Sequence, residues 1–256
     1  MKRVRHAVLL SAAVLLAGAA LLPSVVLAMD ADELIAKHLE AIGGVAKLKA
    51  VQSQQASGKF MTQGMEIPFT MVHKRPNQLR IEAQVMGMTM IQCYDGEKGW
   101  SVNPMTGSPD AQPMGELEEK SFRLQADMDG LLLDWAAKGY TIEFLGADEV
   151  EGTPAYKLRL DTGDGMVFDY LFDQEHFLVL KQNSKVTHEG NEFETQTYMS
   201  DYQDVDGFMV PFAVENRMGD QVMNQIMLET VTNDVPVDAS VFVMPEKAAA
   251  PAAESK

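Results

Sequence analysis

Apolar and polar residues alternate with a period of two through most of this sequence, and this alternation constrains the fold more than any other feature. A period of two is that of a β-strand with one buried face, because successive side chains point to opposite sides of a sheet. The stretches MVFDYLFD (residues 166–173) and FMVPFAV (residues 208–214) each predict such a strand. Their apolar faces carry Met166, Phe168, Tyr170 and Phe172 in the first, and Phe208, Val210, Phe212 and Val214 in the second.

Short turn motifs separate the alternating stretches. Glycine beside asparagine, aspartate, glutamate or glutamine recurs at intervals typical of hairpins, because these residues tolerate the positive φ of tight turns. By this pattern about a dozen strands lie between Gln52 and Thr232. The sequence therefore predicts consecutive hairpins and an antiparallel sheet that curls into an open or closed barrel. The predicted turns are Gln63-Gly64, Asp95-Gly96, Gly163-Asp164-Gly165, Glu189-Gly190-Asn191, Asp206-Gly207 and Gly219-Asp220.

Two stretches have the periodicity of amphipathic helices instead. Residues 30–42 begin with acidic residues, gather their apolar side chains on one helical side and end at Gly43-Gly44. Residues 115–138 carry apolar residues at helical spacing with an interruption at Gly130, which predicts a pair of short helices between two halves of the sheet. The apolar residues of this pair are Leu117, Leu124, Met128, Leu131, Leu132 and Trp135.

The ends of the chain differ from the part between them. Residues 1–28 have a basic start, an apolar middle and small residues before Met29, which predicts a cleaved secretory signal peptide. An uncleaved anchor is the alternative, since the apolar run is long enough to span a bilayer. No cysteine follows the expected cleavage site, so we predict no N-terminal lipidation. Residues 29–246 are expected to form one domain, and residues 247–256, rich in alanine and proline, a disordered tail.

Charge and motifs argue against several classes of function. The formal net charge is −16 at pH 7, and cleavage after residue 28 would remove three basic residues and no acid, giving −19. Such acidity disfavours nucleic acid and bare anionic lipid surfaces as partners. The histidines have no metal-ligand spacing, and Cys93 stands alone in a strand pattern. Asp161-Thr162-Gly163 resembles an aspartic-protease loop, but the sequence has no second copy and the neighbouring residues suit a hairpin turn better. The sequence has no Gly-x-Ser-x-Gly, His-Glu-x-x-His or phosphate-binding glycine loop, so we predict no enzymatic activity, no metal and no cofactor.

Several short motifs, in this order and spacing, are similar to those of the LolA-like proteins, a family of periplasmic lipoprotein carriers and outer-membrane lipoprotein-sorting proteins. HKRPNQLRIE (residues 73–82) precedes YDGEKGWSVNP (residues 94–104), the two expected helices follow, and a second run of hairpins ends at SVFVMP (residues 240–245). SDYQDVDGFMVPF (residues 200–212) is also similar to hairpins of the sorting proteins. The resemblance covers most of residues 29–246.

This resemblance implies a mainly β (α+β) fold: a curved antiparallel half-open barrel with an N-terminal helix and a helical lid on its concave, apolar face. It implies a monomeric periplasmic carrier that shields lipid or lipoprotein acyl chains between sheet and lid, and whose partners are an inner-membrane release complex and an outer-membrane acceptor. Such a carrier needs no catalytic group, because hiding each CH₂ from water contributes about 0.8 kcal/mol. A module of the same fold that binds a partner protein in regulation or stress sensing is the alternative.

The resemblance also gives Arg75 a role, which is to hydrogen-bond the backbone of the lid from the sheet and so to set whether the cavity is closed. A guanidinium has five donors and can hold several free carbonyls at a helix end. The other interpretation is a solvated charge at a strand end before Pro76, which contributes at most about 1 kcal/mol.

The methionines of VMGMTMIQCYDG (residues 85–96) allow three interpretations. Strand alternation places Met86, Met88 and Met90 on one face and Cys93 on the other, unless Gly87 forms a β-bulge. Their thioethers could bind copper(I), although no cluster of histidine or cysteine supports this. They could also fill gaps in a core or form a pliable cavity wall that repacks around acyl chains. The predicted cavity and lid residues are Arg75, Met86, Met88, Met90, Trp100, Leu124, Met128, Leu132, Trp135, Phe168, Tyr170 and Phe212.

Overall fold

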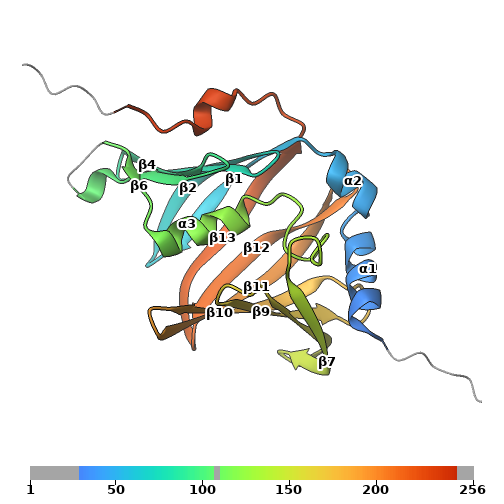
Figure 1. Ribbon diagram of the computed structural model, residues 1–256. Coiled ribbons are helices and arrows are strands. Elements are labelled where there is room, and N and C mark those ends of the chain that lie inside the picture. The colour runs from blue at the N-terminus through green and yellow to red at the C-terminus, as the bar shows by residue number, and fades with distance from the viewer. Residues whose placement is uncertain (1–28, 107–109, 247–256) are drawn as a thin grey trace, which may run out of the picture.

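The computed structural model describes residues 29–106 and 110–246, in which 13 strands form one antiparallel sheet. The sheet curves strongly but does not close, because the strands at its two edges, β6 and β7, are not paired with each other (Figure 1). Its strand order is β6-β5-β4-β3-β2-β1-β13-β12-β11-β10-β9-β8-β7. The predicted half-open barrel is therefore confirmed. The predicted signal peptide and tail lie outside the described residues.

The strands follow the predicted hairpins closely. Almost every strand pairs with its neighbours in sequence, and among the described strands only the pairing of β1 with β13 joins distant parts of the chain. The strands are β1 (Ser53–Thr62), β2 (Met65–Lys74), β3 (Gln78–Val85), β4 (Met88–Tyr94), β5 (Gly99–Val102), β6 (Gln112–Pro113), β7 (Thr141–Val150), β8 (Thr153–Asp161), β9 (Met166–Asp173), β10 (Val179–His188), β11 (Asn191–Val205), β12 (Phe208–Met218) and β13 (Gln221–Asn233).

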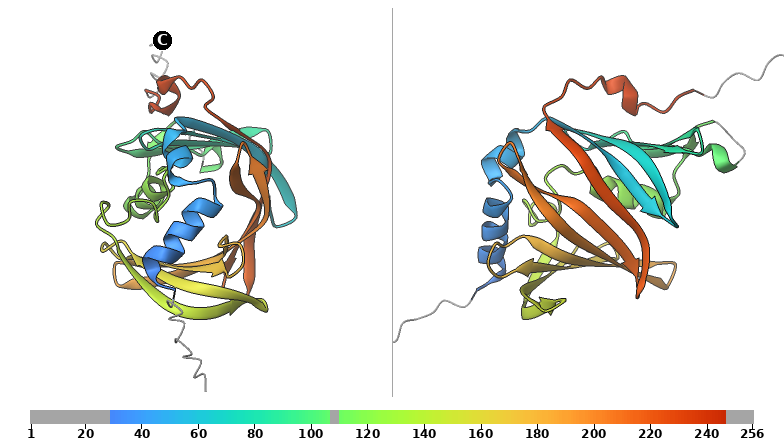
Figure 2. Two further views of the ribbon diagram at one scale, coloured as in Figure 1. Left: turned by 90° about the vertical axis from the view of Figure 1, so that its right-hand side faces the viewer. Right: turned by 180° about the vertical axis from the view of Figure 1, so that it is seen from behind.

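The N-terminal helix forms as predicted, and a second short helix follows it. Asp30 caps helix α1 (Ala31–Ala41), and its side chain accepts a hydrogen bond from the Glu33 amide at 2.8 Å. After the break at Gly43-Gly44 the chain forms helix α2 (Val45–Ala50), which the sequence did not predict because six residues are too few for a clear helical period. In Figure 2, α1 and α2 lie across the concave side of the sheet.

The prediction for residues 115–138 is half right. Its first part forms helix α3 (Glu116–Gln125), but the rest, residues 127–139, is a series of turns and not a second helix. Gly130, Asp134 and Gly139 have φ of 65°, 55° and 77°, values that a right-handed helix does not accommodate. Successive turns bring apolar residues to one side at intervals similar to those of a helix, so the spacing alone misled the prediction. No helix in the described part of the chain is long and apolar enough to cross a membrane.

A C-terminal strap, residues 234–246, covers one end of the convex face of the sheet. The strap contains the short 3₁₀ helix η2 (Ala239–Phe242). Another short 3₁₀ helix, η1 (Pro104–Thr106), follows β5. Phe242 is fully buried against Cys93 and Trp100, and its carbonyl accepts a hydrogen bond from the Trp100 indole at 2.8 Å. Burial raises the pKa of the Cys93 thiol to about 12, so it stays protonated. Figure 2 shows the strap outside the curve of the sheet.

We expect Phe242→Ala to lower the free energy of unfolding by about 3–5 kcal/mol, because it leaves a cavity in a fully buried cluster. Urea denaturation of the two proteins measures this difference. Val243→Ala, next to it but with Val243 63% exposed, is the control and should change stability little. Equal effects of the two substitutions would mean that the strap is not part of the folded core.

Candidate functional site: the concave face and its lid

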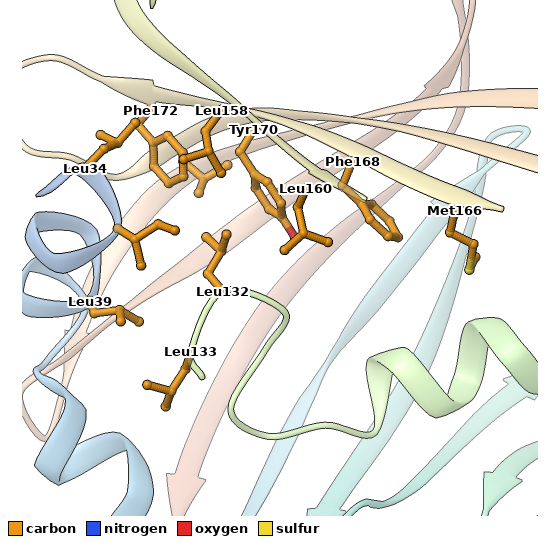
Figure 3. Packing of buried hydrophobic residues seen from close by; sticks show 12 residues of the cluster. Leu34, Leu39, Leu132, Leu133, Leu158, Leu160, Met166, Phe168, Tyr170 and Phe172 are labelled. Atoms are coloured by element: carbon orange, nitrogen blue, oxygen red, sulfur yellow. The ribbon is translucent and has the colours of Figure 1, made fainter. Parts of the chain in front are cut away.

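The main apolar cluster of the molecule fills the concave side between the sheet and the segments that cross it. In Figure 3, side chains of α1, of β8 and β9, and of the turn segment 127–139 converge. The strand residues are those that the period of two placed on one face, and the turn segment adds Leu132 and Leu133. The buried members are Leu34, Ile35, Leu39, Leu132, Leu133, Leu158, Leu160, Met166, Phe168, Tyr170, Phe172 and Val179.

Helix α3 and the turn segment together form the lid, by which we mean residues 116–139. Helix α3 packs Phe122 against Leu79 and Tyr94 in a second concave cluster, over the N-terminal half of the sheet. The turn segment packs against the main cluster, over the C-terminal half. The lid therefore bridges the two halves of the open sheet.

A cavity of ≈ 240 Å³ lies between the lid, the α1–α2 pair and the base of the sheet. Its apolar wall includes Leu48, Met128 and Phe208, and its polar wall includes His73 and Asn233. It is smaller than the roughly 300–1,000 Å³ usual for small-molecule pockets. An acyl chain longer than this space allows would have to displace part of the lid.

Arg75 connects the lid to the sheet and to α2. Its Nε donates to the carbonyl of Val51 at 2.7 Å, and its terminal NH2 group donates to the carbonyl of Leu48 at 2.8 Å and to Asp129 in the lid at 2.6 Å. The carbonyls belong to the end of α2, and Asp129 contributes a side-chain carboxylate and not a backbone carbonyl. The hydrogen bond from Arg75 holds the pKa of the Asp129 carboxyl below its usual range.

His73, two residues before Arg75 on β2, holds the end of α3. Its Nε2 lies 3.0 Å from the carbonyl of Gln125, and because a carbonyl only accepts, the nitrogen carries the proton. Burial lowers the pKa of His73, and the hydrogen bond to Gln125 offsets this only in part. The closed lid thus favours the neutral imidazole.

Helix α3 is also held by the turn between β8 and β9. Lys120 and Arg123 of α3 lie 3.1 and 3.5 Å from the carboxylate of Asp164. Burial raises the pKa of Asp164, but hydrogen bonds from Thr162 and Lys120 outweigh it, and the net pKa is below the usual range. The Arg123 side chain is 51% exposed, so this attachment is weaker than that at Arg75, where both partners are about four-fifths buried.

The structure brings together most of the predicted lid and cavity residues. Phe168, Tyr170 and Leu132 are buried in the main cluster, and Leu124 and Trp135 pack at its margin. Met128 lines the cavity, and Arg75 contacts the lid. Phe212 is buried in β12 but is not a member of the cluster in Figure 3.

The predicted placement is wrong for Met86 and Trp100. Met86 is not in a strand: it forms a tight turn with Gly87, has a φ of 51° and is 76% exposed. Trp100 is paired with Cys93 and packs under the strap on the convex face, away from the lid. Cys93 points to the convex face, and Met88 and Met90 of the same strand point to the other, concave face. Met88, at the end of the strand, is 36% exposed.

The acidic partners of the lid were not predicted. The motif around Arg75 identified the donor, but nothing in the sequence connects it with Asp129, which lies in a stretch expected to be helical. Asp164 was predicted only as part of a turn. Its position between Gly163 and Gly165, opposite two bases of α3, follows from the tertiary fold alone. Within residues 29–106 and 110–246 no three histidine, cysteine or acidic residues are grouped as a metal site would require.

Comparison with known proteins gives structural but no sequence relatives. No family model matches this sequence, and no curated protein matches it. Among solved structures, a LolA superfamily protein from Nitrosomonas europaea is similar with a TM-score of 0.59 and 11% identity over 84% of this chain and 98% of that one. A DUF1329 family protein from Desulfovibrio piger is similar with a TM-score of 0.57 and 12% identity over 83% of this chain and 96% of that one.

A third similar structure is an outer membrane lipoprotein-sorting protein domain from Vibrio parahaemolyticus, with a TM-score of 0.51 and 10% identity over 81% of this chain and 97% of that one. At such identities the likeness concerns the fold alone. The curved open sheet, the helices on its concave face and these neighbours agree with the motifs around Arg75. The protein has the LolA-like fold.

Proposed function

We propose that this protein is a periplasmic carrier that shields the acyl chains of a lipid or lipoprotein beneath its lid. The observation that supports this best is how the lid is attached. Its underside is apolar, whereas polar contacts attach it to the sheet and to α2: Arg75 with Asp129, His73 with Gln125, Lys49 with Asp134, the Gly99 amide with Glu119, Gln92 with Glu118, and Asp164 with Lys120 and Arg123. Breaking these contacts would free an apolar surface without unfolding the sheet.

The fold and the sequence support the rest of the proposal. An acyl chain would enter between the lid and the concave face, where it replaces contacts among the side chains of the main cluster. The flexible thioethers of Met88 and Met90, at the margin of that face, could adapt to chains of different length. Export through the predicted signal peptide would place the protein where such cargo passes between membranes, with a releasing and an accepting partner.

Native mass spectrometry of protein purified without detergent tests the function directly. We expect co-purified lipid or acylated peptide, and displacement of a fluorescent fatty acid by acyl chains in solution. Trp135→Asp, at the margin of the cluster, should weaken that binding at least tenfold. The melting temperature should fall by only a few degrees, which corresponds to a loss of about 1 kcal/mol in the free energy of unfolding. The control is Leu145→Asp on the edge strand β7, where Leu145 is 37% exposed.

A protein that carries no lipid, binds no acyl chain and retains a partner protein would instead support the regulatory alternative. A Trp135→Asp protein that loses binding and stability in proportion would show that the lid is a permanent part of the core.

Arg75→Ala should open the lid without unfolding the sheet. It removes hydrogen bonds to two α2 carbonyls and to a carboxylate, and charge-assisted bonds of this kind contribute about 1.5–3 kcal/mol each. Hydrogen exchange of residues 116–139 should therefore quicken by about tenfold or more, while the β1–β13 core remains protected. Asp129→Asn should have a smaller effect in the same direction.

The control for Arg75 is Arg159→Ala. Arg159 also forms two hydrogen bonds to one aspartate, Asp169 at 2.7 and 2.9 Å, but on the convex face and away from the lid. Identical exchange in the parent and in Arg75→Ala would exclude the proposed latch.

Mild acid should loosen the lid through His73. Its pKa in the closed protein is lowered, so the open state binds a proton more readily, and stability of the closed state is lost as pH falls below about 6.5. Lid exchange and ligand release should quicken between pH 7.5 and 5.5. The acidic partners Asp129 and Asp164, whose pKa values are also lowered, lose their contribution only below about pH 4.

His73→Asn should remove most of this pH dependence, since an asparagine amide can donate to a carbonyl but does not titrate. His176→Asn is the control, because the His176 side chain is 67% exposed and distant in sequence from the lid. An unchanged pH profile in His73→Asn would contradict the assignment.

A further inference from the structure

The concave face is not apolar throughout. Gln182 and Ser184 of β10 are paired with Tyr170 and Phe168 of β9, and directly opposite residues of an antiparallel pair lie on the same face. Both aromatic residues belong to the main cluster under the lid. Gln182 and Ser184 therefore continue the concave face, but with hydrogen-bonding side chains.

The same pairing extends this polar region across β11, β12 and β13. Ser184 is opposite Thr195, Thr197 is opposite Asn216, and Asn216 is opposite Asn224. We call the five residues Ser184, Thr195, Thr197, Asn216 and Asn224 the polar ladder. All five are partly buried, and together they cross four neighbouring strands in the middle of the sheet.

The residues of the polar ladder hydrogen-bond one another across the strands. The hydroxyls of Ser184 and Thr195 are 2.8 Å apart. The Thr197 hydroxyl donates to Asn216 Oδ1 at 2.8 Å, and Asn216 Nδ2 donates to Asn224 Oδ1, also at 2.8 Å. This second chain has a direction, and it ends on the Nδ2 of Asn224. Among the described residues that amide group donates to no acceptor, so it presents a free donor on the concave face.

None of the five side chains carries a charge, although the opposite face of the same strands is highly charged. Lys181 and Lys185 of β10, Glu194 of β11, and Glu215 and Arg217 of β12 alternate with the ladder and lie on the convex face. A site for phosphate or carboxylate would use arginine or lysine. A row of neutral donors and acceptors instead suits a neutral ligand group, and a free amide donor suits a carbonyl oxygen.

We infer that the polar ladder binds the ester carbonyls of the bound amphiphile, at the junction between its acyl chains and its polar part. The chains would lie along Val214 and Ile226, which form the inward-facing pair next to Asn216 and Asn224 in the register, and a carbonyl would accept from Asn224 Nδ2. This rests on the proposed function, and it adds that the protein distinguishes esters from ethers. A ligand with alkyl ether links has the same length but lacks the carbonyl acceptors.

The experiment compares two short-chain phosphocholines below their micelle concentration, one with ester-linked and one with ether-linked chains of equal length. Titration calorimetry of the mature protein should show the ester binding about three- to tenfold more tightly, which is what one neutral hydrogen bond contributes. Asn224→Leu, which keeps the side-chain bulk but removes the donor, should bring this ratio to about one. Its affinity for the ether should not fall.

The matched control is Gln225→Leu. Gln225 is the next residue on β13, and its amide donates to Glu215 of β12 at 2.6 Å on the convex face. It should keep the preference for the ester. If the parent binds both lipids equally, or if both substitutions reduce the preference alike, the inference is wrong while the proposed function stands. If neither lipid nor any longer acyl chain binds, the proposed function itself fails.

Discussion

The sheet curves strongly but does not close, so its concave side would be exposed to water unless other parts of the chain covered it. The inward-facing side chains of β8 and β9 are large and apolar, so water must be kept from them by something other than the sheet. Helices α1 and α2 cover one end of the opening from the N-terminal side, and the lid covers the remainder from the middle of the chain. The first cover precedes β1, whereas the lid is the connection between β6 and β7.

The two covers are held by different physics. Helix α1 buries Leu34, Ile35 and Leu39, and His38 adds a hydrogen bond to the carbonyl of Phe177 at 2.9 Å, so this helix belongs to the core. The lid has apolar contacts along its length, but charged groups also attach both of its parts: Asp164 holds α3, and Arg75 holds Asp129 in the turn segment. Charged contacts respond to pH, salt and competing groups, whereas apolar packing responds to the presence of another apolar body. Arg75 joins the two covers, since it bonds both α2 and the lid.

Much of this fold was predictable, because a period of two and closely spaced turns leave few alternatives to an antiparallel meander. The strands, α1 and α3 follow from local patterns, as do the buried faces at Phe168 and Tyr170. Local patterns failed where the conformation is decided by single residues: Met86 turns because Gly87 follows it, and Asp134 interrupts what would otherwise continue as a helix. Local patterns also could not place Trp100. Alternation shows that its face of the strand is apolar, but not that the C-terminal strap, and not the lid, buries that face.

The pairing of β1 with β13 has a consequence for how the chain folds. Every other pairing joins strands that are neighbours in sequence, so two separate meanders, β1 to β6 and β7 to β13, can assemble by local hairpins. Their union requires closing a loop that spans most of the chain, which is entropically the most demanding step. The junction is also tightly fitted, because a side chain in place of the hydrogen of Gly58 would collide with the carbonyl of Met227. Until the two meanders dock, each exposes half of the concave face, and their order of assembly decides how long that apolar surface is open to other chains.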